Sequence, residues 1–186
     1  MGTLEIIGSI LTLAGIYLAA QGKITAWPLQ LIASVLYTWV FFTVHLFGEA
    51  LLQLIYAFLS LYGWWMWLSD KKIATHFTVS YLTLKQWSMI NLMGMAFTFL
   101  IAQFQFHFLP TDLPYLDSFI LVFAFIAQWM QAVRKIENWL YWVLLDIIAA
   151  GIYWHKDLQL TAALYLALAV IALRGWVQWH QHYHRT

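Results

Sequence analysis

Hydrophobic residues occur along this chain in long, nearly unbroken runs rather than at alternating positions. A helix needs about 20 mainly apolar residues, within a range of about 17–25, to cross the hydrocarbon of a bilayer. Runs of that length lie at about 3–21, 27–47, 49–68, 86–106, 115–133, 137–154 and 158–179. We therefore predict an all-α, polytopic membrane protein with seven transmembrane helices in a single domain, residues 1–186.

The composition favours a bilayer over water. Of 186 residues, 63% are hydrophobic and 9% are charged, whereas a soluble domain carries about 25% charged residues. The net charge of +1 gives no reason to expect a nucleic-acid partner. Without cysteines, a disulfide framework and a cysteine-based metal site are excluded. The start of the chain lacks the features of a cleaved signal peptide, so we expect Leu4–Ala20 to be a retained span.

The cationic residues are unevenly divided between the two ends of the predicted bundle. Seven antiparallel spans place Lys156 alone on the side of the N-terminus. The other side holds Lys23, Lys71, Lys72, Lys85, Arg134, Lys135, Arg174 and Arg185. Lysine and arginine accumulate in cytoplasmic loops. We therefore expect the N-terminus outside and the C-terminus in the cytoplasm.

A shift of 112 residues partly overlays the chain on itself. The matched pairs include Lys23 with Lys135, Trp27 with Trp139, Gly63 with Gly175, Trp64 with Trp176 and Trp67 with Trp179. We predict two parallel three-helix repeats, about 3–68 and about 115–179, joined by a linker helix at about 86–106. Transporters use such parallel repeats and hold the solute near the midplane between them. The alternative is an old duplication kept only for packing.

Asp146 lies about nine residues into the sixth run, about 13 Å along a helix that rises 1.5 Å per residue. A carboxylate near the bilayer centre costs roughly 2.5–3.5 kcal/mol on insertion scales, so it should face the protein interior or a wet cavity. We interpret Asp146 as a counter-ion or hydrogen-bond acceptor for a solute. The alternative is a protonated side chain bonded to a neighbouring helix.

Two tryptophans share a helix face with this carboxylate. Trp139, Trp142 and Asp146 are spaced i, i+3 and i+7. Indole rings offer stacking and cation–π attraction, and a carboxylate offers charge, so the stripe suits a flat, cationic aromatic solute. Trp139 also lies near a predicted membrane interface, where tryptophan is common without any ligand, and both interpretations stay open for it.

The third run carries a polar stripe formed by Gln53, Tyr56 and Ser60, again at i, i+3 and i+7. This stripe fits either a lining for a polar solute or hydrogen bonds between helices, which are worth about 0.6 kcal/mol on average. Trp64 follows within a tryptophan-rich end of the same run. That end is typical of an interfacial anchor, with one ring available as an inner gate.

Motifs for catalysis are missing from the sequence. We find no glycine-rich phosphate loop, no HExxH helix and no nucleophile with its base, so we predict neither an enzyme nor a cofactor. His180, His182 and His184 alternate near the C-terminus. We interpret them as a solvated tail rather than as a metal site.

Two stretches, Gln53–Trp67 and Glu137–Asp146, resemble the two signatures of the Pnu family of vitamin transporters, and the resemblance runs from about Glu5 to Trp179. It implies a SWEET-like fold with a 3+1+3 layout in the bacterial inner membrane. It also implies facilitated diffusion without ion or ATP coupling, trapping of the solute by phosphorylation, and a possible homotrimer. The predicted solute-binding residues are Asp146, Trp142, Trp139, Asn138, Gln53, Tyr56, Ser60 and Trp64.

The expected solute depends on position 146. Family members that carry nicotinamide riboside usually have Asn where this chain has Asp146. An ionised carboxylate only accepts hydrogen bonds, so it suits the aminopyrimidine of thiamine and neutralises its thiazolium. We therefore place thiamine first. Nicotinamide riboside, itself a pyridinium cation, is the alternative, and riboflavin or another nucleoside-like solute follows. Two other classes stay open: a proton-coupled symporter that uses Asp146, and a non-transporting scaffold or receptor.

Overall fold

The computed structural model describes residues 3–43, 45, 47–69, 77–108, 113–155, 157 and 159–185. Within these ranges the chain forms seven helices and no strand, which confirms the seven predicted helices. They are α1 (Thr3–Ala20), α2 (Ala26–Thr43), α3 (Phe47–Ser69), α4 (Leu84–Phe108), α5 (Pro114–Ala132), α6 (Asn138–His155) and α7 (Gln159–Tyr183). The largest differences from prediction are at two ends: α2 stops before the left-handed His45, and α7 continues beyond residue 179.

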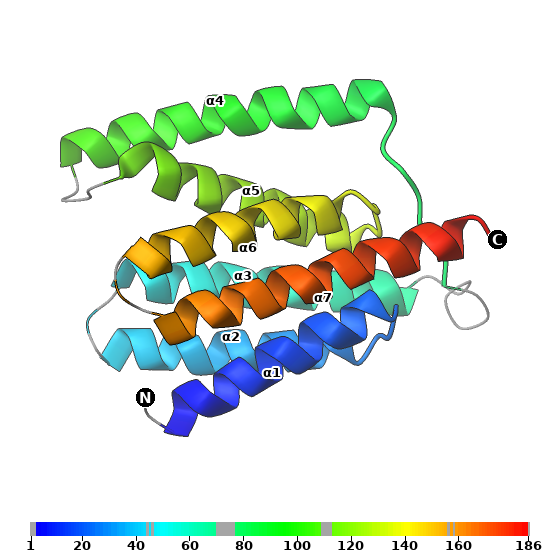
Figure 1. Ribbon diagram of the computed structural model, residues 1–186, viewed down its shortest axis with the longest axis horizontal. Helices are drawn as coiled ribbons and strands as arrows, with labels where there is room; N and C mark the ends of the chain where they lie inside the picture. Colours follow the sequence, from blue (N-terminus) through cyan, green and yellow to red (C-terminus); the bar gives the residue numbers. More distant parts are fainter. Residues whose placement is uncertain are drawn as a thin grey trace.

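Six of the seven helices, all except α6, are long and apolar enough to cross a membrane. The sequence of α6 includes the polar residues Asn138, Asp146 and His155. Nevertheless, α6 runs alongside the other helices and is as long as α1 and α2 (Figure 1).

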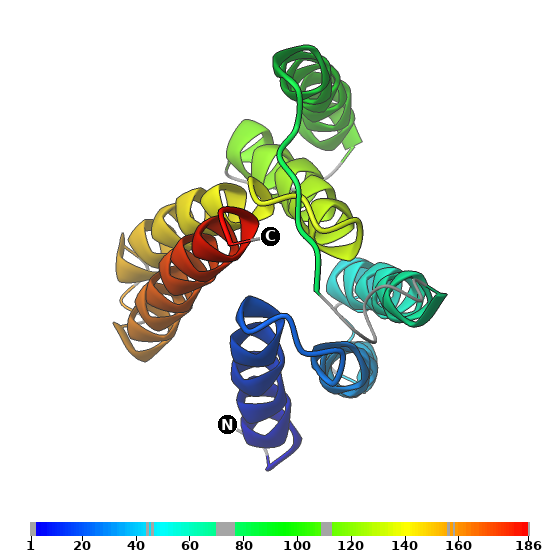
Figure 2. The same cartoon turned by 90° about the vertical axis from the view of Figure 1, so that its right-hand side faces the viewer.

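The helices form a closed ring with one helix outside it. Each ring helix packs on the next in the order α1, α2, α3, α5, α6, α7, and α7 packs back on α1 (Figure 2). In the described part of the chain, α4 packs on α5, and its Asn91 donates a hydrogen bond to the Tyr141 hydroxyl of α6 at 2.8 Å. The ring therefore brings together the first three and the last three helices, which meet where α3 packs on α5 and where α7 packs on α1.

Successive helices are antiparallel, so the two termini lie at opposite ends of the bundle (Figure 1). We call the end that carries the C-terminus the C-terminal end. It also carries the α1–α2 turn, the segment before α4 and the α5–α6 turn. The described cations at this end are Lys23, Lys85, Arg134, Lys135 and Arg185. Of the other cations used in the charge argument, Lys71, Lys72 and Lys156 lie outside the described residues, and Arg174 is exposed on α7.

Two turns at the C-terminal end, 112 residues apart, have the same geometry. Gly22 and Arg134 both have positive φ, 69° and 58°. The amide of Lys23 donates to the carbonyl of Leu18 at 2.9 Å. The amide of Lys135 donates to the carbonyl of Met130 at 2.8 Å. This is the hydrogen-bond pattern of a Schellman helix cap, and it turns the chain identically into α2 and α6.

The repeated Gly-Trp-x-x-Trp motif also packs in the same way in both halves. A Cβ built on Gly63 would lie 2.2 Å from the ring of Trp27. The second tryptophan of that motif, Trp67, meets Trp27 edge-on at 5.4 Å and 83°. In the second half, Gly175 would place a Cβ 2.6 Å from Trp139. Trp139 in turn meets the second tryptophan of its own half at 5.3 Å and 89°. In each motif the glycine thus makes room for an indole ring.

Residues 77–83, which we call the linker strap, cross the C-terminal end. The Ser80 amide donates to the Arg134 carbonyl, and the Ile136 amide donates to the Ser80 carbonyl, both at 3.1 Å. The Leu82 amide donates to Oε1 of Glu137 at 2.7 Å. The linker strap is therefore anchored to the α5–α6 turn.

The other side of the linker strap contacts the end of α7. The Tyr81 hydroxyl bonds to the ring of His180, and the ring of His182 bonds to the Phe77 carbonyl. Desolvation, then the Glu137 carboxylate, raises the pKa of Tyr81, so its hydroxyl stays protonated in this contact. The solvated-tail prediction is therefore wrong for His180 and His182, because the linker strap covers them.

Candidate functional site

Asp146 faces the protein interior. The residue is 7% exposed and lies eight residues beyond the start of α6, about 12 Å from the C-terminal end. It lies within electrostatic range of the Tyr165 hydroxyl on α7, as do Tyr153 and Tyr56. Burial inside the ring satisfies the requirement that a membrane carboxylate avoid lipid.

Aromatic residues lie on α6 itself, on α7, which packs against it, and on α3. Tyr153 of α6 and Tyr165 of α7 stack with ring centroids 5.2 Å apart and planes 15° apart. Tyr56 of α3 and Trp142 of α6 are half-buried and pack against the same hydrophobic cluster, centred on Phe123. The structure thus gathers one carboxylate, hydroxyl groups and ring faces from α3, α6 and α7. This arrangement can hold a flat ring that carries a positive charge and hydrogen-bonding groups.

Two predicted residues occupy structural positions. Trp139 is fully buried against Gly175. Asn138 is also fully buried, and its Nδ2 donates to the Lys135 carbonyl at 2.6 Å, which closes the α5–α6 turn. The structure gives both residues packing or turn-forming contacts, and their predicted contact with solute stays a prediction.

The residues of the predicted stripe on α3 are buried to different degrees. Gln53, Tyr56 and Trp64 are half-buried. Ser60 is 1% exposed, and its Oγ has no hydrogen-bond partner among the described residues. The interhelical hydrogen bond that was the alternative explanation for Ser60 is therefore not seen there.

A second buried polar group was not among the predicted site residues. Gln30 of α2 accepts hydrogen bonds at its Oε1 from Nε2 of Gln128, at 3.0 Å, and from Nε2 of Gln131, at 3.4 Å. All three side chains are buried. The internal repeat could have pointed to Gln30, because Gln30 occupies the position in the first half that matches a predicted site residue in the second half. The shift of 112 residues matches Gln30 to Trp142, just as it matches Gln53 to Tyr165.

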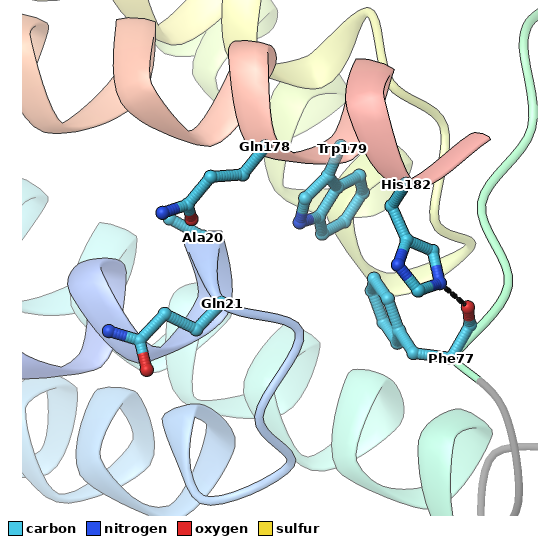
Figure 3. A pocket seen from close by; sticks show the side chains of 6 residues that line it. All are labelled: Ala20, Gln21, Phe77, Gln178, Trp179 and His182. Carbon is cyan, nitrogen blue, oxygen red and sulfur yellow. Dashed lines mark hydrogen bonds between the residues drawn. The ribbon is translucent and has the colours of Figure 1, made fainter. Parts of the chain in front are cut away.

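A cavity of about 260 Å³ opens at the C-terminal end (Figure 3). It lies between the ends of α1 and α7 and the linker strap, and its lining residues are Ala20, Gln21, Phe77, Gln178, Trp179 and His182. A groove of about 450 Å³ runs along the same helix pair and includes Tyr17 and Arg174. Neither space reaches Asp146. Both follow the α1–α7 junction between the two halves of the ring.

The described residues contain no group of three His, Asp or Glu side chains arranged to hold a metal. His180 instead stacks on Trp176, with ring centroids 5.6 Å apart. The chemistry available in the described part is therefore stacking, hydrogen bonding and charge neutralisation around Asp146.

The sequence profile described as "Nicotinamide mononucleotide transporter" matches residues 2–181. The chain is 24% identical to the "Nicotinamide riboside transporter PnuC" of Escherichia coli (strain K12), over 95% of this chain and 84% of that protein. It is 26% identical to the protein of the same name from Neisseria mucosa, over 86% of this chain and 65% of that protein. It is 24% identical to the "Riboflavin/roseoflavin transporter RibM" of Streptomyces davaonensis, over 94% and 83%.

A solved structure shares the fold. The "Crystal structure of the Vitamin B3 transporter PnuC" superimposes with a TM-score of 0.78 at 24% identity, and the match covers 98% of this chain and 82% of that one. The arrangement of seven helices described above is therefore that of a known polytopic membrane protein.

Proposed function

Since this chain belongs to the nicotinamide mononucleotide transporter family, we propose that it carries nicotinamide riboside across the bacterial inner membrane by facilitated diffusion. Phosphorylation inside the cell then traps the solute. The observation that carries this proposal is the buried Asp146 with the aromatic residues around it, in a chain whose relatives include nicotinamide riboside transporters. This reverses the sequence-based order, which put thiamine first.

The chemistry of the Asp146 group supports this solute. The nicotinamide ring of nicotinamide riboside is a flat pyridinium, which stacks on indole and phenol rings and is attracted to their faces. Asp146 balances its positive charge, and the hydroxyls of Tyr56 and Tyr165 offer hydrogen bonds to ribose and carboxamide. Trp142 supplies a ring face one turn from the carboxylate.

The transport architecture belongs to the same proposal. All seven helices, α6 included, cross the membrane as SWEET-like 3+1+3 repeats, and the two halves rock against each other around the solute. The matched turns at Gly22 and Arg134 and the matched glycine–tryptophan contacts support two equivalent halves. The predicted homotrimer stays a prediction.

Thiamine is the second candidate because of one observation, the carboxylate at position 146. An ionised carboxylate pairs with an aminopyrimidine and a thiazolium at least as well as with a carboxamide. The names of the relatives above give no support to thiamine, and so it takes second place.

The test is uptake into proteoliposomes with labelled nicotinamide riboside, thiamine and riboflavin measured in parallel. We expect nicotinamide riboside to equilibrate without ATP or an ion gradient, and empty liposomes are the control. Equilibration of thiamine alone would instead support the carboxylate argument. Accumulation above the outside concentration under a pH gradient would indicate proton coupling. Failure of all three solutes would favour a scaffold or receptor.

A further inference from the structure

The glutamine cluster, Gln30 with Gln128 and Gln131, connects two helices that do not pack on each other. In the described part of the chain, α2 packs on α1 and α3, whereas α5 packs on α3, α4 and α6. Gln30 nevertheless bonds to both glutamines of α5. Its side chain therefore extends from the first half of the ring to the second across the space between them.

The cluster lies between Asp146 and the C-terminal end. Gln30 is four residues from the start of α2, and Gln128 is four residues from the end of α5, so both lie about 6 Å below that end. Asp146 lies at about twice that depth by the same rise per residue. A solute that moves from Asp146 to the C-terminal end along the ring must pass the level of these glutamines.

The cluster is held closed by an arrangement that leaves one hydrogen-bond donor unpaired. Gln30 Oε1 accepts both bonds, while Gln30 Nε2 is buried without a partner among the described residues. An unpaired buried donor costs free energy, so this arrangement is less stable than one in which every donor is paired. That is the property expected of a barrier that opens and closes rather than of a permanent core contact.

We propose that the glutamine cluster is the inner gate of the transporter, and that the bonds from Gln30 to α5 close the space between the two halves on the C-terminal side of Asp146. This rests on the proposed function, because a gate has meaning only in a chain that carries a solute. Opening breaks the bonds to Gln128 and Gln131, separates α2 from α5 and lets the solute leave Asp146 toward the C-terminal end.

The absence of native cysteines makes a cross-linking test direct. In proteoliposomes, a Gln30→Cys/Gln128→Cys variant is joined by a short, reducible bifunctional thiol reagent. We expect uptake of nicotinamide riboside to fall by about tenfold or more, since the halves can no longer separate, and to recover after reduction. Each single cysteine variant receives the same reagent as a control. A matched pair within one half, Ser9→Cys/Tyr37→Cys, whose native side chains are 2.7 Å apart, should still transport after cross-linking.

Distance measurements test the gate without transport. Spin labels on Thr25→Cys and Gln181→Cys, two exposed positions on different halves at the C-terminal end, report how far the halves are apart. Adding Gln30→Ala should shift the population toward longer distances. An unchanged distribution, or full uptake by the cross-linked protein, would overturn the gate. If the distances shift but the protein does not carry nicotinamide riboside, the gate proposal stands and the proposed solute is wrong.

Discussion

Buried polar atoms mark the places in this bundle where packing alone does not explain the residue. A polar group taken out of water costs free energy unless it is hydrogen-bonded. Asp146, Ser60 and Gln30 are all at most 8% exposed, and two of them have buried side-chain atoms without partners in the described structure. We therefore expect substitutions at such positions to affect solute handling more than substitutions on the lipid-facing side.

Replacing Asp146 separates the need for charge from the need for an acceptor. Asparagine keeps an acceptor and adds a donor for a carboxamide, so we expect Asp146→Asn to retain binding and uptake of nicotinamide riboside within about threefold. Asp146→Leu leaves solute groups unpaired, at a cost of about 1–3 kcal/mol, or roughly 5- to 150-fold in affinity. Calorimetric binding and uptake measure both, and Leu144→Ala, on the exposed side of α6, is the control. Equal losses in the two Asp146 variants would show that the charge itself is required.

The motif glycines give a prediction for stability. A Cβ at Gly175 would lie 2.6 Å from Trp139, so Gly175→Ala should destabilise the protein by about 1–3 kcal/mol through overpacking. Gly63→Ala should do the same. Gly151 has no atom within 4 Å of a built Cβ, so Gly151→Ala should be neutral or stabilising, by about 0.5–1 kcal/mol. Thermal unfolding followed by tryptophan fluorescence in detergent would detect the opposite shifts, and identical midpoints would contradict the packing argument.

At the scale of elements, the helices could be predicted and the connections could not. A long apolar run fixes a helix in lipid because its backbone must bond internally, and for that reason all seven runs matched helices. The linker strap has no such periodicity. Its hydrogen bonds to the α5–α6 turn and to α7 go to residues more than fifty positions away, such as the bond from Leu82 to Glu137. Its cover over His180 and His182 therefore had no local signal.

The linker strap should loosen when its carboxylate anchor is removed. Hydrogen bonds to charged groups contribute about 1.5–3 kcal/mol, so Glu137→Ala should speed hydrogen exchange of the Leu82 amide by roughly tenfold or more. The Ser80 amide, which bonds to the Arg134 carbonyl at 3.1 Å, should respond less. Exchange measured by mass spectrometry resolves the two, and Gln181→Ala, at an exposed position on α7, serves as the control. Unchanged exchange at Leu82 would mean that this contact does not hold the linker strap.

At the scale of the whole molecule, the internal repeat was a better guide to the arrangement of the helices than single residues were. Asp146 stands out in the sequence because a carboxylate is unusual in a membrane helix, and the structure buries it. Gln30 resembles ordinary polarity near a helix end. Only the closure of the ring brings α2 to face α5, and a linear sequence does not show that closure. The same limit applies to Trp139, whose packing against Gly175 could not be seen from the sequence.

The charges of the bundle predict its orientation in the membrane. The C-terminal end carries most of the described cations, and such ends face the cytoplasm in bacterial membranes. In this cysteine-free chain, Asp157→Cys in the α6–α7 turn should react with a membrane-impermeant maleimide in intact spheroplasts. Thr25→Cys, exposed in the α1–α2 turn, should react only after permeabilisation. The reverse labelling would invert the bundle and place the glutamine cluster on the outer side of Asp146. The native chain, which has no thiol, sets the background.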